Sequence, residues 1–500
     1  MEKTMNQKIS YGLFFCDFIV MCFAFKSYCI EYYCNDAYSI LCVADQGARF
    51  HLTNGRFILS LFLFLFNVVH INVVRMSVFF NLLYFFTVSL CINIVQKKLR
   101  NLFFTKEKAV CLFEEIFLNI SLFIGYCNIF SAEWVYYNMC TIQFIISIFF
   151  ATLSAVLFFH KKGFFLSLAT LFVSYNSYQP GMGIFVWLLL LFVYLNSDGK
   201  VTKNCFFQIF GAVLICFINF ILNLIILKLF IVFNVITSSE RFSGFHIKVV
   251  CSYLKDLLCF QRILWFKGDG LTSFPLLFVF LVALFFLYFY SFFKNRETYY
   301  NVIYPVVLML GGLLISFLPI MVMTFFWAAP RQLVPIFFLF TFILVSLLYR
   351  ETFYSLKLKS LAIGICVFFI SFIIYFIQIY AGDVLLTNKI DKQRSMAIKD
   401  AISDYEKSSG NIIQYIGFCH DKFPTWKYDL HLPYMWDSQN NMFMPEWSNL
   451  TGLNFYTYST YVKIDVPQDI KNSFLEKDWF CLDTQRQIIF NEDKCYICVY

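Results

Sequence analysis

EYYCNDAYSILCVADQGARFHLTNGR, residues 31–56, follows the first long apolar segment of the chain and decides how the rest is interpreted. The stretch holds three acids, two arginines and a histidine, whereas only 14% of the whole chain is charged. Charged side chains are costly inside hydrocarbon, so charge gathered beside a membrane segment usually serves a function. The stretch therefore predicts a site at one face of a membrane.

The composition is that of a protein with many membrane segments. Hydrophobic residues make up 60% of the 500 residues, whereas soluble domains are about half apolar and about one quarter charged. The net charge of +8 does not indicate a nucleic-acid partner, because the cations lie in short loops between apolar runs, as the positive-inside rule describes. Membrane lipid is the expected partner.

Eleven apolar segments approach the roughly 20 residues that a helix needs to cross a hydrocarbon core of ~30 Å. They are residues 11–30, 76–95, 109–127, 139–159, 162–176, 183–195, 205–232, 274–293, 302–325, 333–349 and 361–380. With the N-terminus in the cytoplasm, every short loop on that side is basic, as at Lys97 and Lys98. The odd number of crossings then puts residues 381–500 on the outer side.

The chain divides at residue 380. Residues 1–380 are predicted to form an all-α polytopic membrane domain, with residues 31–75 as its first outer loop. In residues 381–500, acids, prolines and tryptophans replace the apolar runs, which predicts a small α+β domain outside the membrane. One or two disulfides are expected on that oxidising side, with the pairing left open. The cysteines concerned are Cys419, Cys481, Cys495 and Cys498.

One further apolar run, residues 57–74, does not fit as a crossing. If residues 57–74 crossed the membrane, the basic loop at residues 96–100 would lie on the outer side, and every later loop would lie on the opposite side from the one predicted. We expect residues 54–72 to form one or two helices that lie against the outer membrane face. Insertion as a hairpin is the alternative. The polar side of these helices would carry Asn67, His70 and Asn72.

The chain lacks the motifs of several large enzyme classes. It contains no Walker loop, no Rossmann fingerprint, no HExxH and no GxSxG. An enzyme without a nucleotide site is expected to use a substrate that arrives already activated. In a membrane, the natural form of such a substrate is linked to a polyprenyl lipid.

Sugar transfer from a lipid phosphate needs a base for the acceptor hydroxyl and cations for the departing phosphate. Asp36, directly after the first crossing, is the candidate base. A guanidinium can bind two phosphate oxygens at once, so arginines in outer loops are candidates for holding the phosphate. They are Arg49, Arg56, Arg241 and Arg331.

Two acids in outer loops have alternative interpretations. Asp45 could hold a divalent cation together with Asp36, or it could cap the helix that follows, and the cap is favoured. No metal site is therefore assigned. Glu133 stands beside Trp134, and the pair is interpreted as an interfacial anchor rather than as a catalytic acid.

A break between two short apolar segments supplies the last candidates. Gln179 precedes Pro180 and Gly181, and backbone groups at such a break must face a cavity or water. A bare reverse turn would explain the same residues. The polar run before the proline favours a loop that contacts sugar, through Tyr178 and Gln179.

Several fragments, taken in order, resemble the serotype-converting O-antigen glucosyltransferases, a phage-type family of the membrane-embedded GT-C superfamily. The fragments are Asn35-Asp36 followed by Gly55-Arg56, then residues 177–185 and 240–244, Pro330-Arg331, and residues 391–401. The family has Asn-Asp-Asp followed closely by Arg. This chain has one carboxylate at that place, Asp36, and its next arginine is Arg49.

The resemblance implies a GT-C-like fold in the bacterial inner membrane, with a cytoplasmic N-terminus and a periplasmic C-terminal domain. It implies inverting transfer of glucose, or a related hexose, from undecaprenyl phosphate to lipid-linked O-antigen. Asp36 would then be the base, and Asn35 would lie with the arginines in the substrate site. The juxtamembrane helices of the family would match residues 54–72.

Two rival functions remain. An O-antigen polymerase would also be a multi-spanning enzyme and would use arginine-rich outer loops. A flippase or other transporter of lipid-linked glycans should show paired charges deep in its helices, or two related halves. The predicted crossings carry few charges, which favours the transferase.

Overall fold

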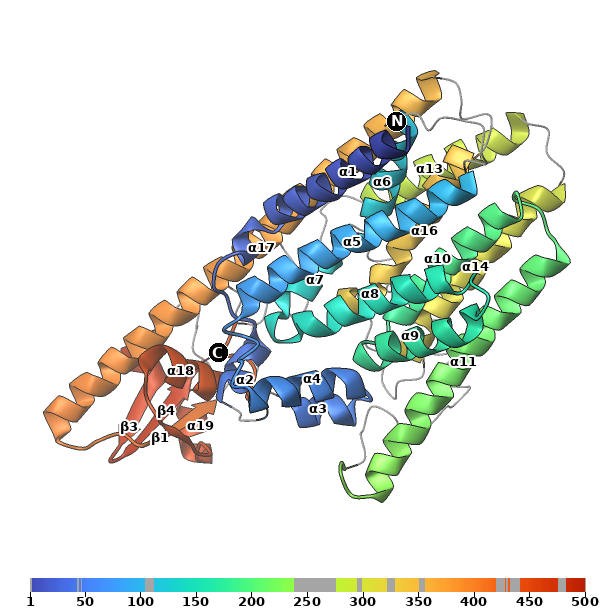
Figure 1. Ribbon diagram of the computed structural model, residues 1–500. Coiled ribbons are helices and arrows are strands. Elements are labelled where there is room, and N and C mark those ends of the chain that lie inside the picture. Colours follow the sequence, from blue (N-terminus) through green and yellow to red (C-terminus); the bar gives the residue numbers. More distant parts are fainter. Residues whose placement is uncertain are drawn as a thin grey trace.

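The computed structural model is mostly helical, with one small sheet (Figure 1). It describes residues 2–42, 45, 47–103, 112–237, 276–294, 299–321, 329–349, 356–419, 428, 430–431, 441–474 and 483–499.

The helices that begin before residue 300 make up most of the helical part of the chain. They are α1 (Glu2–Ala24), η1 (Lys26–Tyr28), α2 (Asn35–Cys42), α3 (Ala48–Thr53), α4 (Phe57–Val68), α5 (Ser77–Phe103), α6 (Leu112–Tyr126), α7 (Ser131–Tyr136), η2 (Asn138–Cys140), α8 (Thr141–Leu157), α9 (Gly163–Ser177), α10 (Gly181–Asn196), α11 (Lys203–Val232), α13 (Leu276–Lys294) and α14 (Tyr299–Met321). The bundle is completed by α15 (Pro330–Leu333), η4 (Val334–Phe337), α16 (Phe338–Tyr349) and α17 (Leu356–Ser409).

Burial separates inner from outer helices. In α10 nearly every residue is buried, so this helix lies in the core of the bundle. In α11 the large apolar residues Phe206, Phe207 and Phe217 are exposed, as expected of a helix that faces lipid. Helices satisfy all their backbone groups internally, which makes them stable in such surroundings.

Each of the eleven apolar segments predicted to cross the membrane contains a helix. Within the described residues, five helices are long and apolar enough to cross a membrane by length and composition. They lie at Ser77–Leu102, Asn138–Leu157, Lys203–Val232, Pro330–Tyr349 and Ser360–Ser409. A helical membrane protein is therefore indicated, and the count of eleven crossings stays a prediction.

Helix α4 lies over the ends of other helices at one face of the bundle. Its first residue, Phe57, contacts Phe230 near the end of α11, whereas Phe66 contacts Phe80 at the start of α5. A 12-residue helix is only about 18 Å long, too short to cross ~30 Å of hydrocarbon. This geometry favours the surface helix over the hairpin. Its exposed apolar residues are Leu61, Phe64, Leu65 and Val68.

The C-terminal domain is carried on α17. This helix has 54 residues, so at 1.5 Å per residue it is about 80 Å long and extends well beyond the bundle (Figure 1). It runs without a break through residue 380, where the sequence predicted a domain boundary.

Two fully buried acids on α17 hold loops of the C-terminal domain. Asp391 accepts hydrogen bonds from Tyr428 Oη (2.6 Å) and the Met442 amide (3.2 Å), and Asp383 Oδ1 lies 2.7 Å from His431 Nδ1.

The small sheet has the strand order β2-β1-β4-β3. Strand β1 is parallel to both neighbours, and β3 pairs antiparallel with β4. The strands are β1 (Tyr415–Cys419), β2 (Val462–Lys463), β3 (Ile488–Asn491) and β4 (Lys494–Cys498), and the helices of the domain are α18 (Asn449–Thr457), α19 (Gln468–Ser473) and α20 (Thr484–Gln487).

The described cysteines of this domain test only the two-disulfide form of the expectation. No disulfide joins any two of Cys419, Cys495 and Cys498, and Cys481 lies outside the described residues. Two disulfides would use all four cysteines. One of them would contain Cys481, and the other would have to join two of the remaining three cysteines, so a two-disulfide framework does not form.

Candidate functional site

Asp36 lies at the start of α2, where the chain leaves the bundle toward the C-terminal domain. Its Oδ1 accepts a hydrogen bond of 2.9 Å from the indole Nε1 of Trp447, 411 residues later. Helix α2 also packs on α18, and the hydroxyls of Tyr38 and Tyr456 are 2.7 Å apart across this contact. The C-terminal domain therefore reaches the candidate base directly.

Polar side chains from the bundle hold the loop before Arg56. The Gly55 carbonyl accepts a hydrogen bond of 2.8 Å from Asn223 in α11, and the Asn54 carbonyl accepts one of 3.2 Å from Gln179. Gly55 has φ +69°, and a Cβ there would lie only 3.0 Å from Asn223 Oδ1, so this turn requires glycine. Gln179 acts here by positioning the loop that carries Arg56.

The Arg56 guanidinium enters the bundle without a carboxylate partner in the described part of the chain. Its Nη1 donates to Gln143 Oε1 at 3.5 Å, and its guanidinium carbon lies 5.1 Å from the ring centre of Tyr178. The Nε is fully buried and has no acceptor among the described residues. Burial lowers the pKa of Arg56 because it disfavours the charged form. A buried cation of this kind is suited to an anionic ligand.

Arg331, at the start of α15, is bound on several sides. Its Nη1 lies 3.2 Å from Glu133 Oε2, and its backbone N–H donates to the same oxygen. Its guanidinium carbon is 4.4 Å from the ring centre of Tyr137, and its carbonyl accepts a hydrogen bond of 2.7 Å from Trp134 Nε1. Both Glu133 and Trp134 are buried within the protein, so their interpretation as an interfacial anchor is wrong.

Tyr178 lies within electrostatic reach of both arginines. Burial raises the pKa of its hydroxyl to about 12, while the charges of Arg331 and Arg56 act to lower it. The buried Cys140 thiol also lies within electrostatic reach of Arg56, Asp36 and Arg331. Three residues predicted from separate loops of the sequence, Arg56, Tyr178 and Arg331, therefore lie near one another. Asp36 lies within electrostatic reach of the same Cys140 thiol.

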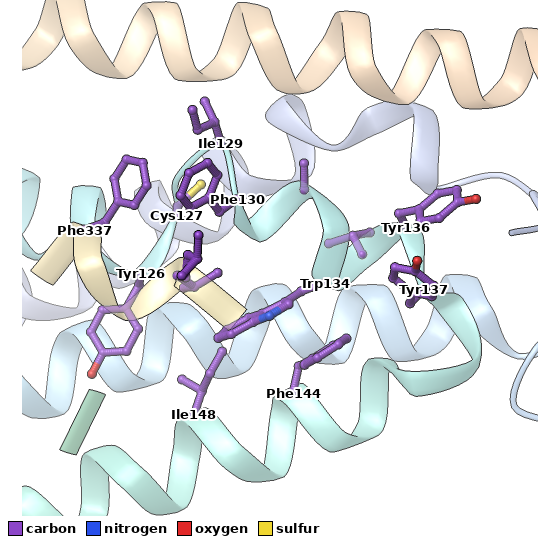
Figure 2. Packing of buried hydrophobic residues seen from close by; sticks show 14 of the residues in the cluster. Tyr126, Cys127, Ile129, Phe130, Trp134, Tyr136, Tyr137, Phe144, Ile148 and Phe337 are labelled. Carbon is purple, nitrogen blue, oxygen red and sulfur yellow. The ribbon is translucent and has the colours of Figure 1, made fainter. Parts of the chain in front are cut away.

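Close packing fixes Tyr178 in place. Figure 2 shows Trp134 lying against Phe144, and the two rings are stacked at 5.0 Å. Tyr178 meets both rings edge to face. Its carbonyl accepts a hydrogen bond of 3.0 Å from Ser147, and a Cβ on Gly181 would lie 2.2 Å from the Ser147 hydroxyl oxygen. The break at Gln179 and Pro180 is thus a tightly packed turn.

The other predicted site residues lie elsewhere. Arg49 is 91% exposed at its side chain and only approaches Asp45, at 3.9 Å. Asp45 accepts hydrogen bonds from the backbone N–H groups of Gly47 (3.1 Å) and Arg49 (3.5 Å) at the start of α3, in agreement with the cap interpretation. Asn35 is buried beside Asp36, and Arg241 lies outside the described residues.

In the part of the chain that the structure describes, no three or more His, Cys, Asp or Glu residues are grouped so that they could hold an ion. The carboxylate of Asp45 faces its own helix start rather than Asp36.

Sequence reasoning missed Trp447 as a partner of Asp36 and Glu133 as a partner of Arg331. It also missed the pair of Asp383 and His431, in which the imidazole is 76% exposed and the carboxylate is fully buried. None of these pairs has a short-range signal, because each joins residues from distant parts of the chain. For Trp447, the change of composition after residue 380, where acids, prolines and tryptophans replace the apolar runs, was the one general signal.

The ion pair between Glu133 and Arg331 gives a first prediction. We expect Glu133→Gln to reduce the free energy of unfolding by about 3 kcal/mol, because removing one partner leaves a largely buried charge uncompensated. Chemical unfolding in mild detergent measures the change. The exposed Glu446→Gln is the control, and the double variant with Arg331→Met should recover most of the loss. An unchanged free energy for Glu133→Gln alone contradicts the assignment.

Comparison with known proteins gives no assignment. No protein-family model, no curated protein and no solved structure matches the chain.

Proposed function

We propose that this chain is an inverting membrane glycosyltransferase of the bacterial inner membrane. It transfers glucose, or a related hexose, from undecaprenyl phosphate to a lipid-linked O-antigen unit on the periplasmic side. The single observation that supports the proposal is the Arg56 guanidinium, whose Nε is fully buried and which has no carboxylate partner among the described residues, while Arg331 lies within electrostatic reach of it.

Arg56 favours a phosphate ligand because its positive charge is desolvated and has no carboxylate partner among the described residues. A buried charge is costly unless it is paired, and a guanidinium binds phosphate through two parallel hydrogen bonds. The neighbouring Arg331 already has Glu133 as a partner. Of the two arginines, Arg56 is therefore the primary phosphate ligand, and Arg331 adds a second positive charge nearby.

The location supports a lipid substrate. Helix α4 follows Arg56 directly and exposes an apolar face that includes Phe64 and Val68. An apolar helix at a membrane surface lies at the depth of lipid headgroups. A polyprenyl phosphate in the membrane would have its phosphate at the same depth.

The proposed reaction is a single displacement. The acceptor hydroxyl oxygen attacks the anomeric carbon of the sugar, Asp36 takes the hydroxyl proton, and the bond from that carbon to the phosphate oxygen breaks. Undecaprenyl phosphate leaves with the bonding electron pair, and Arg56 and Arg331 stabilise its added negative charge. One displacement inverts the configuration at the anomeric carbon.

A reconstituted assay tests the function. Purified protein in liposomes is given undecaprenyl phosphate carrying radiolabelled glucose and a lipid-linked O-antigen unit. Transfer of one labelled sugar to the acceptor is the expected result. Longer chains made from O-antigen units alone would instead indicate a polymerase. Movement of the lipid across the bilayer without a new glycosidic bond would indicate a flippase.

A further inference from the structure

The indole ring of Trp447 has a solvent-exposed face, while its N–H group is held by a hydrogen bond. The residue is 60% exposed, yet its indole Nε1 donates a hydrogen bond of 2.9 Å to Asp36. Large apolar side chains with this exposure are common singly on protein surfaces. The bond to the candidate base distinguishes this one, because it holds the open indole face beside the carboxylate.

The backbone around Trp447 is well anchored. Trp447 lies two residues before the first residue of α18, and its carbonyl accepts a hydrogen bond of 3.1 Å from Thr451 Oγ1. The next residue, Ser448, donates to the Met442 carbonyl at 2.7 Å. Helix α18 is in turn fixed on α17, where Lys399 Nζ donates to the Thr457 carbonyl at 2.9 Å. The indole is therefore presented by a rigid support.

We propose that Trp447 binds a hexopyranose ring of the acceptor glycan on its exposed face and positions the Asp36 carboxylate for that ring. This proposal rests on the proposed function and deepens it. An aromatic ring offers a flat apolar face with a polar edge, and a pyranose has an apolar C–H face with hydroxyls around its rim. A sugar stacked on the indole would place its rim hydroxyls near the edge that carries Nε1, where Asp36 lies.

The hydrogen bond suits a positioning role. The indole N–H can only donate, so it fixes Oδ1 of Asp36 and does not compete for the proton that Asp36 would accept. The C-terminal domain would then supply the acceptor platform, while Arg56 and Arg331 of the bundle hold the donor phosphate.

Two variants separate the two roles of Trp447. Trp447→Ala removes the ring and is expected to raise the acceptor KM about tenfold, with the donor KM unchanged. Trp447→Phe keeps a ring face but loses the N–H, so it should mainly lower kcat, also by about tenfold. Tyr458→Asn is the matched control, because Tyr458 is 94% exposed in the same domain and its φ of 54° is tolerated by Asn.

A binding measurement does not depend on catalysis. Saturation-transfer NMR with the delipidated O-antigen oligosaccharide of the host strain should give a sugar signal for the wild type and for Tyr458→Asn, and none for Trp447→Ala. A signal that persists in Trp447→Ala, or its absence in the wild type, overturns the platform, and the reconstituted transfer assay then judges the proposed function separately. Sugar binding that depends on Trp447 in a protein without transfer activity would keep the platform and reject the transferase.

Discussion

Asp36→Asn is expected to lower the rate of sugar transfer by at least about 10²-fold, the contribution typical of a positioned base. The asparagine can still accept the hydrogen bond from Trp447 Nε1 through its amide oxygen, so the fold and the contact between α2 and α18 should persist. The variant removes the ability to take a proton together with the negative charge of the carboxylate. The measurement is the initial transfer rate at saturating donor, together with thermal unfolding of the same preparation.

Asp45→Asn is the matched control for this variant. Asp45 lies on the same outer stretch but caps α3 through backbone N–H groups, so its neutralisation should leave transfer near the wild-type rate and reduce stability by about 1 kcal/mol or less. Transfer at the wild-type rate by a folded Asp36→Asn protein would remove Asp36 as the base. Equal losses in both variants would point to a general effect of charge in this loop.

The sequence suggested candidate site residues but did not describe their environment. Asp36, Arg56 and Arg331 could be proposed because charge is rare in an apolar chain and has few reasons to lie beside membrane helices. Arg49 met the same criterion and yet is exposed. Composition cannot tell an inward from an outward arginine on a short helix, because that direction depends on how α3 packs against α4.

The contacts that define the site could not be predicted, because they join distant segments. Trp447 meets Asp36 across 411 residues, and Asn223 holds Gly55 from within the mostly apolar helix α11. The asparagines of α11 carry no local signal that shows which loop each contacts. Helices themselves were predictable from the apolar runs, and the spacing of apolar residues in 388–406 also predicts a helix there, in agreement with α17. The unbroken junction of that helix with the last apolar segment was not predictable, since it depends on the domain that packs along α17.

Arg56→Met is expected to abolish phosphate binding without reducing stability. The guanidinium is desolvated, has a buried Nε without an acceptor among the described residues, and experiences the like charge of Arg331. Replacing such a charge by an apolar side chain of similar length is often neutral or stabilising, by about 1–4 kcal/mol. We therefore expect the unfolding temperature of the free protein to stay the same or to rise, while transfer activity is lost.

The ligand effect provides the sharper readout. Undecaprenyl phosphate at about 100 times its Kd should stabilise the wild type by about 2.7 kcal/mol, and this gain should vanish in Arg56→Met. Arg49→Met, at an exposed position on the same loop, should retain the full gain. A structural arginine would behave in the opposite way, since its removal would lower the unfolding temperature and leave the lipid effect intact. A residue of a phosphate site is expected to lower the stability of the free protein and to raise the stability of the complex. Its charge is paired only when the ligand is bound.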